Sequence, residues 1–266
     1  MELITTSDGT TVSYDKYGSG PALVLVHGGF SDHVTNWQEC KTMLADRFTV
    51  YAFARRGRGE TSATEGHSVQ DEAADIIALL RALGEPAFLL GHSYGAVCAL
   101  EAAAVCPEGV RKLVLYEPPG PEAWTAEQVA RLESFAARED WDGLVEAFMG
   151  ILQVSPEEIA EIKATPFWGV WTQDAKATLN DLRALTKHDF DAERLRTLSI
   201  PVLLIIGSES PREIYLTDTL NAVLQDKRIT TLEGTAHEGM TMVPDQFVAK
   251  ISEFLLDVTA DRASGR

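Results

Sequence analysis

Apolar residues in this chain gather into short unbroken runs that alternate with segments of helical spacing. The runs 22–26 and 201–206 contain no polar residue, which is typical of strands buried on both faces of a parallel sheet. Apolar residues over 69–83 recur at intervals of three and four, after a capping box formed by Ser68 and Asp71. This alternation predicts a parallel sheet with helices on both faces, and it places functional residues at the carboxyl ends of the strands.

The same patterns predict eight strands. The first two form an antiparallel hairpin, because the turn Ser7-Asp8-Gly9 between them contains an Asp-Gly pair. The predicted strands are 3–6, 11–17, 22–26, 49–54, 88–90, 112–116, 201–206 and 228–232. Helices are expected over 37–47, 69–83, 96–105 and 213–224, and from Pro244 onward. The expected fold class is therefore α/β, with a mostly parallel eight-stranded sheet.

The alternation of strand and helix stops between Pro119 and Leu198. This segment has helical patterns at 126–138, 141–152, 156–163 and 175–185, and it holds four of the five tryptophans. Such an insertion predicts a helical cap beside the sheet. We therefore expect a core domain (1–118 and 199–260), a helical cap (119–198) and a polar tail (261–266).

The clearest chemical motif is the segment Gly91-His92-Ser93-Tyr94-Gly95. An apolar strand leads into it and an almost uncharged helix follows. Glycines on either side of Ser93 permit a tight strand-to-helix turn that lifts the hydroxyl above the sheet edge. Ser93 is therefore a candidate nucleophile.

A serine hydroxyl is a weak nucleophile and needs a histidine within hydrogen-bond reach. His237 fits this role because it lies late in the chain, in a glycine-flanked loop after the last strand, at the same sheet edge as Ser93. His27 is expected to brace the turn after the third strand, and His92 is the variable residue of the serine motif. The other histidines are expected to be surface residues: His33, His67 and His188.

The loop His27-Gly28-Gly29-Phe30 follows the third strand and predicts an oxyanion hole. One donor is expected to be the backbone N–H of Tyr94, directly after the nucleophile, and the other the N–H of Gly29 or Phe30. Two backbone donors aimed at a developing oxyanion are what acyl transfer requires.

The order of His27-Gly28, the Ser93 turn, a helical insertion and a late His237 resembles the α/β-hydrolase fold family, in particular its capped esterase and lactonase-like members. The resemblance spans nearly the whole chain and implies a serine hydrolase, with Ser93 as nucleophile and His237 as base. The loop 55–59 also resembles the family's loop after the fourth strand, although Ala54 stands where an aspartate is common. Epoxide hydrolases and haloalkane dehalogenases of this fold carry an aspartate in place of the serine.

The resemblance leaves the acid of the triad open. Members usually carry an aspartate three residues after the glycine that ends the seventh strand, but Gly207 is followed there by Ser210. Glu117, at the end of the sixth strand, and Glu209 are the two replacements. We favour Glu117, because the sixth strand lies between the serine strand and the seventh, and because Pro118 is expected to hold Glu117 extended. Some members of the fold also carry their acid after the sixth strand.

The tryptophans of the insertion have two interpretations. They could pack the cap helices together, or they could line an apolar substrate pocket with Phe30 and Tyr94. The residues expected to bind substrate in the second case are Trp124, Trp168 and Trp171.

Composition limits the partners and the compartment. The chain has 40 acidic and 23 basic residues and a formal charge of −17, which repels phosphate backbones and anionic lipids, so neither nucleic acid nor a membrane is an expected partner. Three cysteines, no signal-peptide pattern and no apolar run near about 20 residues predict a cytoplasmic protein without disulfides. The sequence has neither metal-ligand spacing nor a phosphate-binding glycine loop, so no cofactor and no metal is expected.

These features predict a cofactor-free serine hydrolase that cleaves a carboxylic ester or lactone with a hydrophobic body, through an acyl-enzyme on Ser93. Two alternatives remain: a carbon–carbon bond hydrolase that uses the same triad, and a non-catalytic small-ligand receptor on the same fold. The motifs define neither the substrate nor the oligomeric state.

Overall fold

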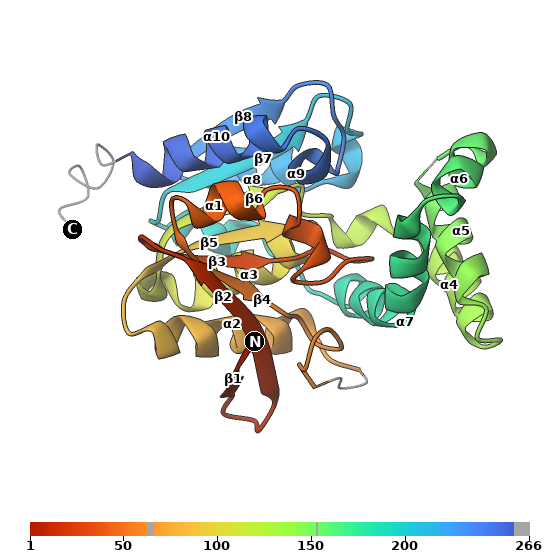
Figure 1. The fold of residues 1–266 in the computed structure, drawn as a ribbon, viewed down its shortest axis with the longest axis horizontal. Helices are drawn as coiled ribbons and strands as arrows, with labels where there is room; N and C mark the ends of the chain where they lie inside the picture. The colour runs from red at the N-terminus through yellow and green to blue at the C-terminus, as the bar shows by residue number, and fades with distance from the viewer. Residues whose placement is uncertain (63–65, 153, 258–266) are drawn as a thin grey trace.

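The computed structural model describes residues 1–62, 66–152 and 154–257. Its centre is an eight-stranded sheet with the strand order β1-β2-β4-β3-β5-β6-β7-β8 (Figure 1). Strand β2 runs antiparallel to both of its neighbours, and all other neighbouring strands are parallel. The strands are β1 Glu2–Thr5, β2 Thr11–Gly18, β3 Ala22–Val26, β4 Thr49–Phe53, β5 Ala87–His92, β6 Val110–Tyr116, β7 Val202–Gly207 and β8 Lys227–Leu232. The expected fold class is confirmed.

Helices cover both faces of the sheet because the side chains of each strand alternate between them. In β3, Val24 and Val26 pack with α2 and α3, whereas Leu23 and Leu25 pack on the opposite face with α1 and α10. The core helices are α1 Lys41–Ala45, α2 Val69–Leu83, α3 Tyr94–Val105, α8 Thr217–Val223, α9 Gly239–Met242 and α10 Pro244–Leu256. Short 3₁₀ turns lie at Thr35–Trp37, Pro107–Gly109, Pro121–Ala123, Glu193–Thr197 and Arg212–Ile214.

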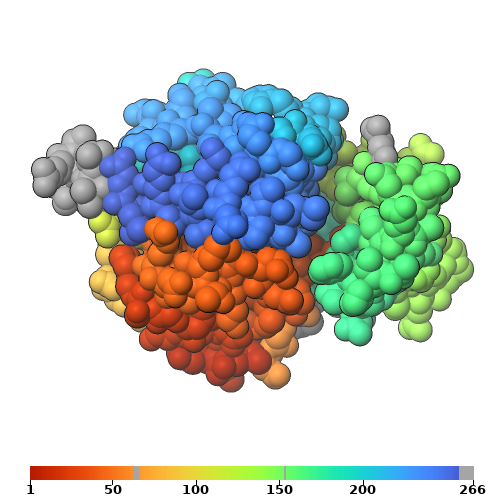
Figure 2. All heavy atoms as spheres, turned by 45° about the horizontal axis from the view of Figure 1, so that its top comes forward, coloured from red at the N-terminus to blue at the C-terminus, as the bar shows by residue number. Residues whose placement is uncertain are grey.

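Four helices between β6 and β7 form a lobe beside the sheet (Figures 1 and 2). They are α4 Ala126–Ala136, α5 Trp141–Ile151, α6 Pro156–Lys163 and α7 Pro166–Thr186. These helices share a hydrophobic cluster of their own, and Phe30 joins that cluster from the loop after β3. The inserted lobe therefore meets the sheet at the loop that is expected to form the oxyanion hole. Along the described chain, no helix is both long and apolar enough to cross a bilayer.

Two core helices differ from the sequence-based expectation because tertiary contacts override helical spacing. The segment 37–47 is not one helix: a 3₁₀ turn precedes the short α1, and the Asn36 side chain in that turn accepts the Gly28 N–H. The helix expected from residue 213 begins only at Thr217, because Tyr215 has an extended backbone and bridges Pro119. In the lobe, α7 begins earlier than expected, at Pro166, where a proline suits the first helical turn.

Candidate active site

Ser93 lies in a sharp turn between β5 and α3. Its backbone has φ 55° and ψ −129°, a strained conformation for a residue with a Cβ. Close contacts explain the flanking glycines, because a Cβ on Gly91 would come within 2.5 Å of the Gly95 carbonyl oxygen, and a Cβ on Gly95 would come equally close to the carbonyl of Val26. The Ser93 side chain makes no capping hydrogen bond to α3, so its hydroxyl is not committed to the helix.

His237 and Glu117 form a hydrogen-bonded pair at the same sheet edge. Nδ1 of His237 lies 2.6 Å from Oε2 of Glu117, and because an ionised carboxylate only accepts, Nδ1 carries the proton and Nε2 is left as the basic nitrogen. Glu117 is fully buried, and its Oε1 accepts the Gly207 N–H at 2.7 Å. Glu209 is exposed on the loop after β7. The structure therefore brings Glu117, the acid that the sequence analysis favoured, to His237 from the end of β6.

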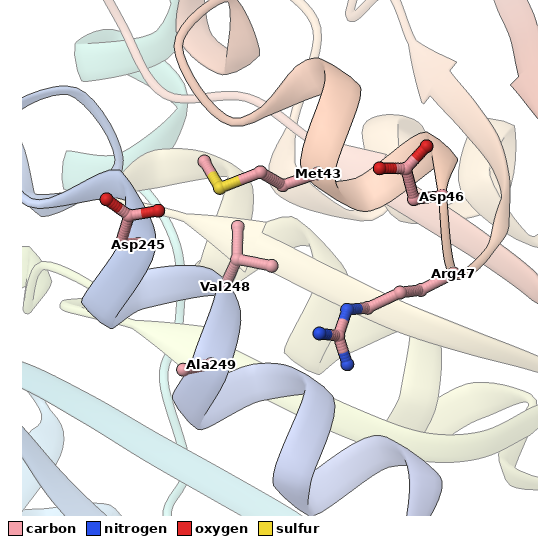
Figure 3. A pocket seen from close by; sticks show the side chains of 6 residues that line it. All are labelled: Met43, Asp46, Arg47, Asp245, Val248 and Ala249. Atoms are coloured by element: carbon pink, nitrogen blue, oxygen red, sulfur yellow. The ribbon is translucent and has the colours of Figure 1, made fainter.

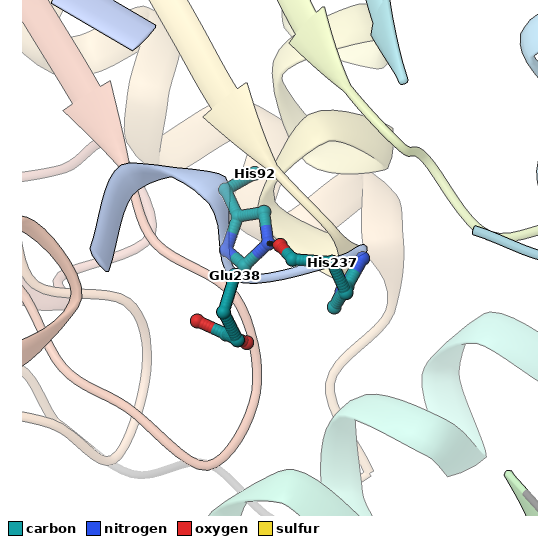
Figure 4. Close-up of side chains that lie close together, drawn as sticks. All are labelled: His92, His237 and Glu238. Carbon is teal, nitrogen blue, oxygen red and sulfur yellow. Dashed lines mark hydrogen bonds between the residues drawn. The ribbon is translucent and has the colours of Figure 1, made fainter. Parts of the chain in front are cut away.

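Opposing influences act on the pKa of His237. Burial lowers this pKa, but the hydrogen bond and the negative charge of Glu117, together with the charge of Glu238, raise it above the ordinary value of 6.5. The Glu238 side chain is exposed, and one of its carboxylate oxygens lies within 4.8 Å of a ring nitrogen of His237 (Figure 4). The His237 side chain is itself 28% exposed, so solvent reaches the imidazole.

The loop that carries His237 is held to the strands beside it. His92 Nε2 lies 3.1 Å from the carbonyl oxygen of His237, as the dashed line in Figure 4 shows, and the two ring centroids are 4.5 Å apart. The Tyr116 hydroxyl donates to the carbonyl of Ala236 at 2.5 Å and accepts the Gly239 N–H at 3.0 Å. Because Ser93 directly follows His92, these contacts place the His237 loop beside the serine turn.

Tyr215 also belongs to this site, and sequence reasoning missed it. Its ring stacks on His237 with a centroid distance of 5.3 Å and an interplanar angle of 12°. Its hydroxyl lies 3.1 Å from His237 Nδ1. Burial and the charge of Glu117 raise the pKa of Tyr215, so the phenol stays protonated. No local pattern marks this residue, because the bridge to Pro119 is what brings it to the site.

The loop after β3 lies against the serine turn, since a Cβ on Gly28 would lie 3.0 Å from the Cβ of Ser93. Tyr94 is the first residue of α3, so its N–H has no partner within the helix. The Phe30 N–H donates to the Thr178 hydroxyl of α7 at 2.7 Å, whereas the described part of the chain offers no hydrogen-bond acceptor to the Gly29 N–H. Of the two amides that the sequence leaves open, Gly29 has the uncommitted N–H.

Backbone strain gathers at this site. Among the described residues, four that are not glycine have a positive φ, and three of these are Phe30, Ser93 and Glu117. The expectation that Pro118 holds Glu117 extended is wrong, because Glu117 has φ 48°. The hydrogen bonds of its backbone N–H to Ile205 and of its carboxylate to Gly207 and His237 hold it there. Each such conformation costs about 1–3 kcal/mol and persists where surrounding contacts impose it, often at functional sites.

Trp171 lies close to the oxyanion loop, and Trp124 is connected to that loop through Phe148. The Trp171 ring centroid is 6.4 Å from that of Phe30, and Phe148 lies 4.7 Å from Phe30 and 5.0 Å from Trp124. We refer to Phe30, Trp124, Phe148 and Trp171 as the aromatic cluster. It joins the loop after β3 to the inserted helices with apolar rings.

Trp168 lies next to the aromatic cluster, with its ring centroid 6.3 Å from that of Trp171, and its other partners are within the inserted helices. Its Nε1 donates to Asp142 on α5, and Lys163 of α6 lies 4.9 Å from its ring centroid. Its side chain is 8% exposed and packs in the lobe's own hydrophobic cluster. Trp168 therefore connects three cap helices.

The expectation that His33, His67 and His188 are surface residues is wrong. They are 5%, 7% and 6% exposed. His67 and His188 each lie 3.2 Å from a carboxylate oxygen, of Glu72 and Glu101 respectively. Their polar sequence neighbours suggested exposure, but acids from other elements lie against two of them: Asp181 of α7 is 3.8 Å from His67, and Glu101 of α3 is the partner of His188. His27 fits its expected role, since its Nδ1 lies 2.8 Å from the carbonyl oxygen of Gly28 in the turn after β3.

Two groups of side chains in the described ranges have potential metal ligands within 4.8 Å of one another: His92, His237 and Glu238, and also His67, Glu72 and Asp181. In the first group, His92 Nε2 faces a carbonyl oxygen, so it carries a proton and offers no lone pair. In the second, Arg55 already binds both carboxylates, and its charge opposes a cation. Neither group has the chemistry of a metal site.

A surface hollow of about 380 Å³ lies away from this site, between α1 and α10 (Figure 3). Its lining contains carboxylates, one guanidinium and aliphatic groups, but no serine, cysteine or histidine. The lining residues are Met43, Asp46, Arg47, Asp245, Val248 and Ala249. The hollow has no nucleophile and is not a candidate active site.

The sheet order, the strained serine turn and the Glu–His pair at its edge define an α/β hydrolase. The model of the alpha/beta hydrolase family matches residues 23–250, so this chain belongs to that family. An uncharacterised hydrolase of Bacillus subtilis (strain 168) is 25% identical over 255 residues, 93% of each chain.

Solved structures agree with this assignment. An α/β hydrolase from Sphaerobacter thermophilus aligns with a TM-score of 0.84 and 30% identity, covering 96% of this chain and 100% of that one. The enol-lactonase from Burkholderia xenovorans shares the fold, with a TM-score of 0.78 and 19% identity over 96% of this chain and 100% of its own. The family expected from the sequence is confirmed.

Proposed function

We propose that this α/β hydrolase is a serine hydrolase that cleaves a carboxylic ester or a lactone with a hydrophobic body. The observation that carries the proposal is the 2.6 Å hydrogen bond between buried Glu117 and His237, beside the turn that holds Ser93. A buried carboxylate that sets the tautomer of an imidazole is what a serine nucleophile needs. Binding of a ligand alone needs no such pair.

In the first half of the reaction, the Ser93 hydroxyl attacks the substrate carbonyl while His237 Nε2 takes its proton. The N–H groups of Tyr94 and Gly29 stabilise the oxyanion of the tetrahedral intermediate. His237 then protonates the leaving alkoxide, which departs and leaves an acyl-enzyme. Glu117 stabilises the imidazolium while it exists, because its carboxylate accepts the Nδ1 proton in a hydrogen bond.

In the second half, His237 takes a proton from a water molecule, and the resulting hydroxide attacks the acyl carbonyl. The second tetrahedral intermediate collapses, Ser93 is reprotonated, and the carboxylic acid is released. An ester yields an acid and an alcohol, whereas a lactone yields one hydroxy acid. Neither half-reaction requires a cofactor.

The aromatic cluster supports a hydrophobic substrate. Phe148 and Trp171 of the inserted helices meet the ring of Phe30. Phe30 directly follows Gly29, whose amide is the proposed oxyanion donor. A group attached to the reacting carbonyl would meet these rings, and burial of apolar area there would contribute to binding.

The decisive experiment is a turnover screen of the wild type beside Ser93→Ala. The panel contains p-nitrophenyl esters, lactones and vinylogous diketones, and we expect turnover of esters or lactones by the wild type only. Turnover restricted to the diketones would assign carbon–carbon bond hydrolysis to the same residues. Binding of panel members without turnover of any would indicate a receptor and overturn the proposal.

Glu238→Gln is expected to move the acid limb of the kcat/KM profile to lower pH. The charge of Glu238 favours the imidazolium, so its removal lowers the pKa of His237 and keeps the neutral base available in more acidic solution. The measurement is kcat/KM for a p-nitrophenyl ester between about pH 5 and 9. Glu233→Gln, an exposed acid earlier in the same loop, is the matched control. An acid limb that stays in place in Glu238→Gln, or moves equally in the control, contradicts this account.

Trp171→Ala is expected to change the preference for acyl chain length, because its ring lies against Phe30. The ratio of kcat/KM for long and short p-nitrophenyl esters should change by roughly tenfold, the scale of one or two methylenes in an apolar pocket. Trp168→Ala, one ring further from Phe30, should change that ratio less and should lower the melting temperature, since loss of a buried tryptophan costs about 3–5 kcal/mol. Unchanged ratios and lower melting temperatures in both variants would mean that the tryptophans only pack.

A further inference from the structure

Helix α7 turns a polar face toward the core domain. Asp174, Thr178 and Asp181 have the spacing i, i+4 and i+7, so they share one side of the helix. Thr178 and Asp181 are only 5% and 2% exposed, although the polar side of a surface helix usually faces water. These side chains instead meet the loops after β3 and β4.

Arg55, in the loop after β4, ties this face to the loop after β3. Its Nε donates to the carbonyl of His27 at 2.8 Å, and its Nη2 donates to the carbonyl of Gly28 at 2.9 Å. The same guanidinium donates to both carboxylate oxygens of Asp181, at 3.0 and 2.7 Å. The Arg55 side chain is fully buried. It therefore connects α7 directly to the backbone that precedes Gly29.

Arg58, from the same loop, binds both acids of α7. It donates to the two carboxylate oxygens of Asp174 at 2.8 and 2.9 Å and to those of Asp181 at 2.9 and 2.8 Å. Each acid is therefore held through both of its oxygens, which fixes orientation as well as position. We refer to Arg55, Arg58, Asp174, Thr178 and Asp181 as the α7 network.

Thr178 is the member of the α7 network that holds the oxyanion loop. Its Oγ1 accepts the Phe30 N–H at 2.7 Å, donates to Asp174 at 2.7 Å and lies 3.3 Å from an Nη2 donor of Arg58. The hydroxyl thus uses its single proton and accepts the Phe30 N–H. Its Cγ2 methyl lies 3.1 Å from the position that a Cβ on Gly29 would take. Thr178 therefore contacts both residues of the loop that could supply a donor.

The hydrogen bond between Thr178 and the Phe30 N–H leaves the Gly29 N–H as the amide available to an oxyanion. Phe30 has φ 50°, a conformation that needs surrounding contacts to hold it. Because a peptide unit is planar, the bond of Thr178 to the Phe30 N–H fixes the Gly29–Phe30 peptide, and the bond of Arg55 to the Gly28 carbonyl fixes the preceding peptide, which carries the Gly29 N–H.

We propose that Thr178 is a positioning residue of the oxyanion hole: it holds the Phe30 amide so that the Gly29 amide faces the oxyanion, and the α7 network holds Thr178. The inference rests on the proposed function, because an oxyanion forms only if Ser93 attacks a carbonyl. It makes α7 part of the catalytic apparatus as well as a cover for the substrate.

Thr178→Val tests the proposal, since it removes the hydroxyl and keeps the shape of the side chain. We expect kcat for a p-nitrophenyl ester to fall roughly 10- to 100-fold with KM within about threefold, because a misplaced donor weakens the transition state more than substrate binding. Thr178→Ser retains the hydroxyl and should stay within about threefold of the wild-type kcat. The matched control is Thr186→Val, on the same helix, where the hydroxyl bonds helix carbonyls; it should behave as the wild type.

Amide hydrogen exchange of the wild type provides a second measurement if Thr178→Val does not fold. The Phe30 amide should be protected, and rapid exchange there would overturn the proposal. A folded Thr178→Val enzyme with unchanged kcat would also overturn it and leave the proposed function intact. A wild type without ester or lactone turnover would instead refute the proposed function, and with it the assignment of Gly29 as an oxyanion donor.

Discussion

Ser93→Ala is expected to abolish ester and lactone hydrolysis, with a loss in kcat on the order of 10⁶-fold, because no other group can form the acyl-enzyme. The fold should be unaffected. Alanine keeps the Cβ of serine, so the strain at φ 55° is unchanged, and the lost hydroxyl makes no capping bond to α3. Turnover of p-nitrophenyl esters measures the first effect, and the melting temperature, expected within about 2 °C of the wild type, measures the second.

A fluorophosphonate probe makes this result specific to the residue. The probe should label the wild type and should also label Ser134→Ala, in which the exposed serine of α4 is removed. It should not label Ser93→Ala. If Ser93→Ala keeps more than a few per cent of wild-type turnover, or is still labelled, another group is the nucleophile.

Glu117→Gln is expected to lower kcat by roughly 10³ to 10⁴, the effect of converting a triad acid to an amide. The geometry gives the reason. The amide oxygen can keep the bond to the Gly207 N–H, which turns the NH₂ group toward His237 Nδ1. Nδ1 must then accept, so the imidazole proton moves to Nε2, and Nε2 can no longer take the proton of Ser93. Steady-state kinetics should show the loss mainly in kcat.

Glu209→Gln is the matched control for the acid. It removes a carboxylate from the exposed loop after β7, at the end of the strand where the family usually carries its acid, and it should cost little activity. If Glu209→Gln shows the large loss and Glu117→Gln the small one, Glu209 orients His237 in solution, and the assignment of Glu117 is wrong.

Much of the architecture follows from local order along the chain. Unbroken apolar runs such as Ala22–Val26 have no polar face, so they become inner parallel strands, and the capping box at Ser68 begins α2 where the sequence predicts. The Gly-x-Ser-x-Gly motif is also visible in the sequence, although only one of its glycines is required by a local contact: a Cβ on Gly91 would meet Gly95, whereas a Cβ on Gly95 would meet the carbonyl of Val26 in β3. Apolar runs, caps and motif spacings lie within a few residues, and a sequence displays them directly.

The interior ionic contacts could not be predicted in the same way. His67 and His188 look like surface residues beside polar neighbours, yet they are buried, with Asp181 of α7 beside His67 and Glu101 of α3 beside His188. The sequence analysis did not single out Asp174, Thr178 and Asp181, and their common side of α7 does not by itself show which segment they meet. The ion pairs of Asp174 and Asp181 form with arginines of the loop after β4. Helical periodicity shows which residues share a side of a helix, but not which distant segment packs against that side.

The sequence by itself determined the fold, the serine turn, the candidate histidine and a choice of two acids and two oxyanion amides. The tertiary structure decided how those choices lie in space: Glu117 contacts His237, and Thr178 engages Phe30 and leaves the Gly29 amide uncommitted. The physical reason is that strands and turns arise from contacts within a short stretch. The orientation of a carboxylate or an amide instead depends on hydrogen bonds between β6, β7, the His237 loop and α7, which come together only when the chain has folded.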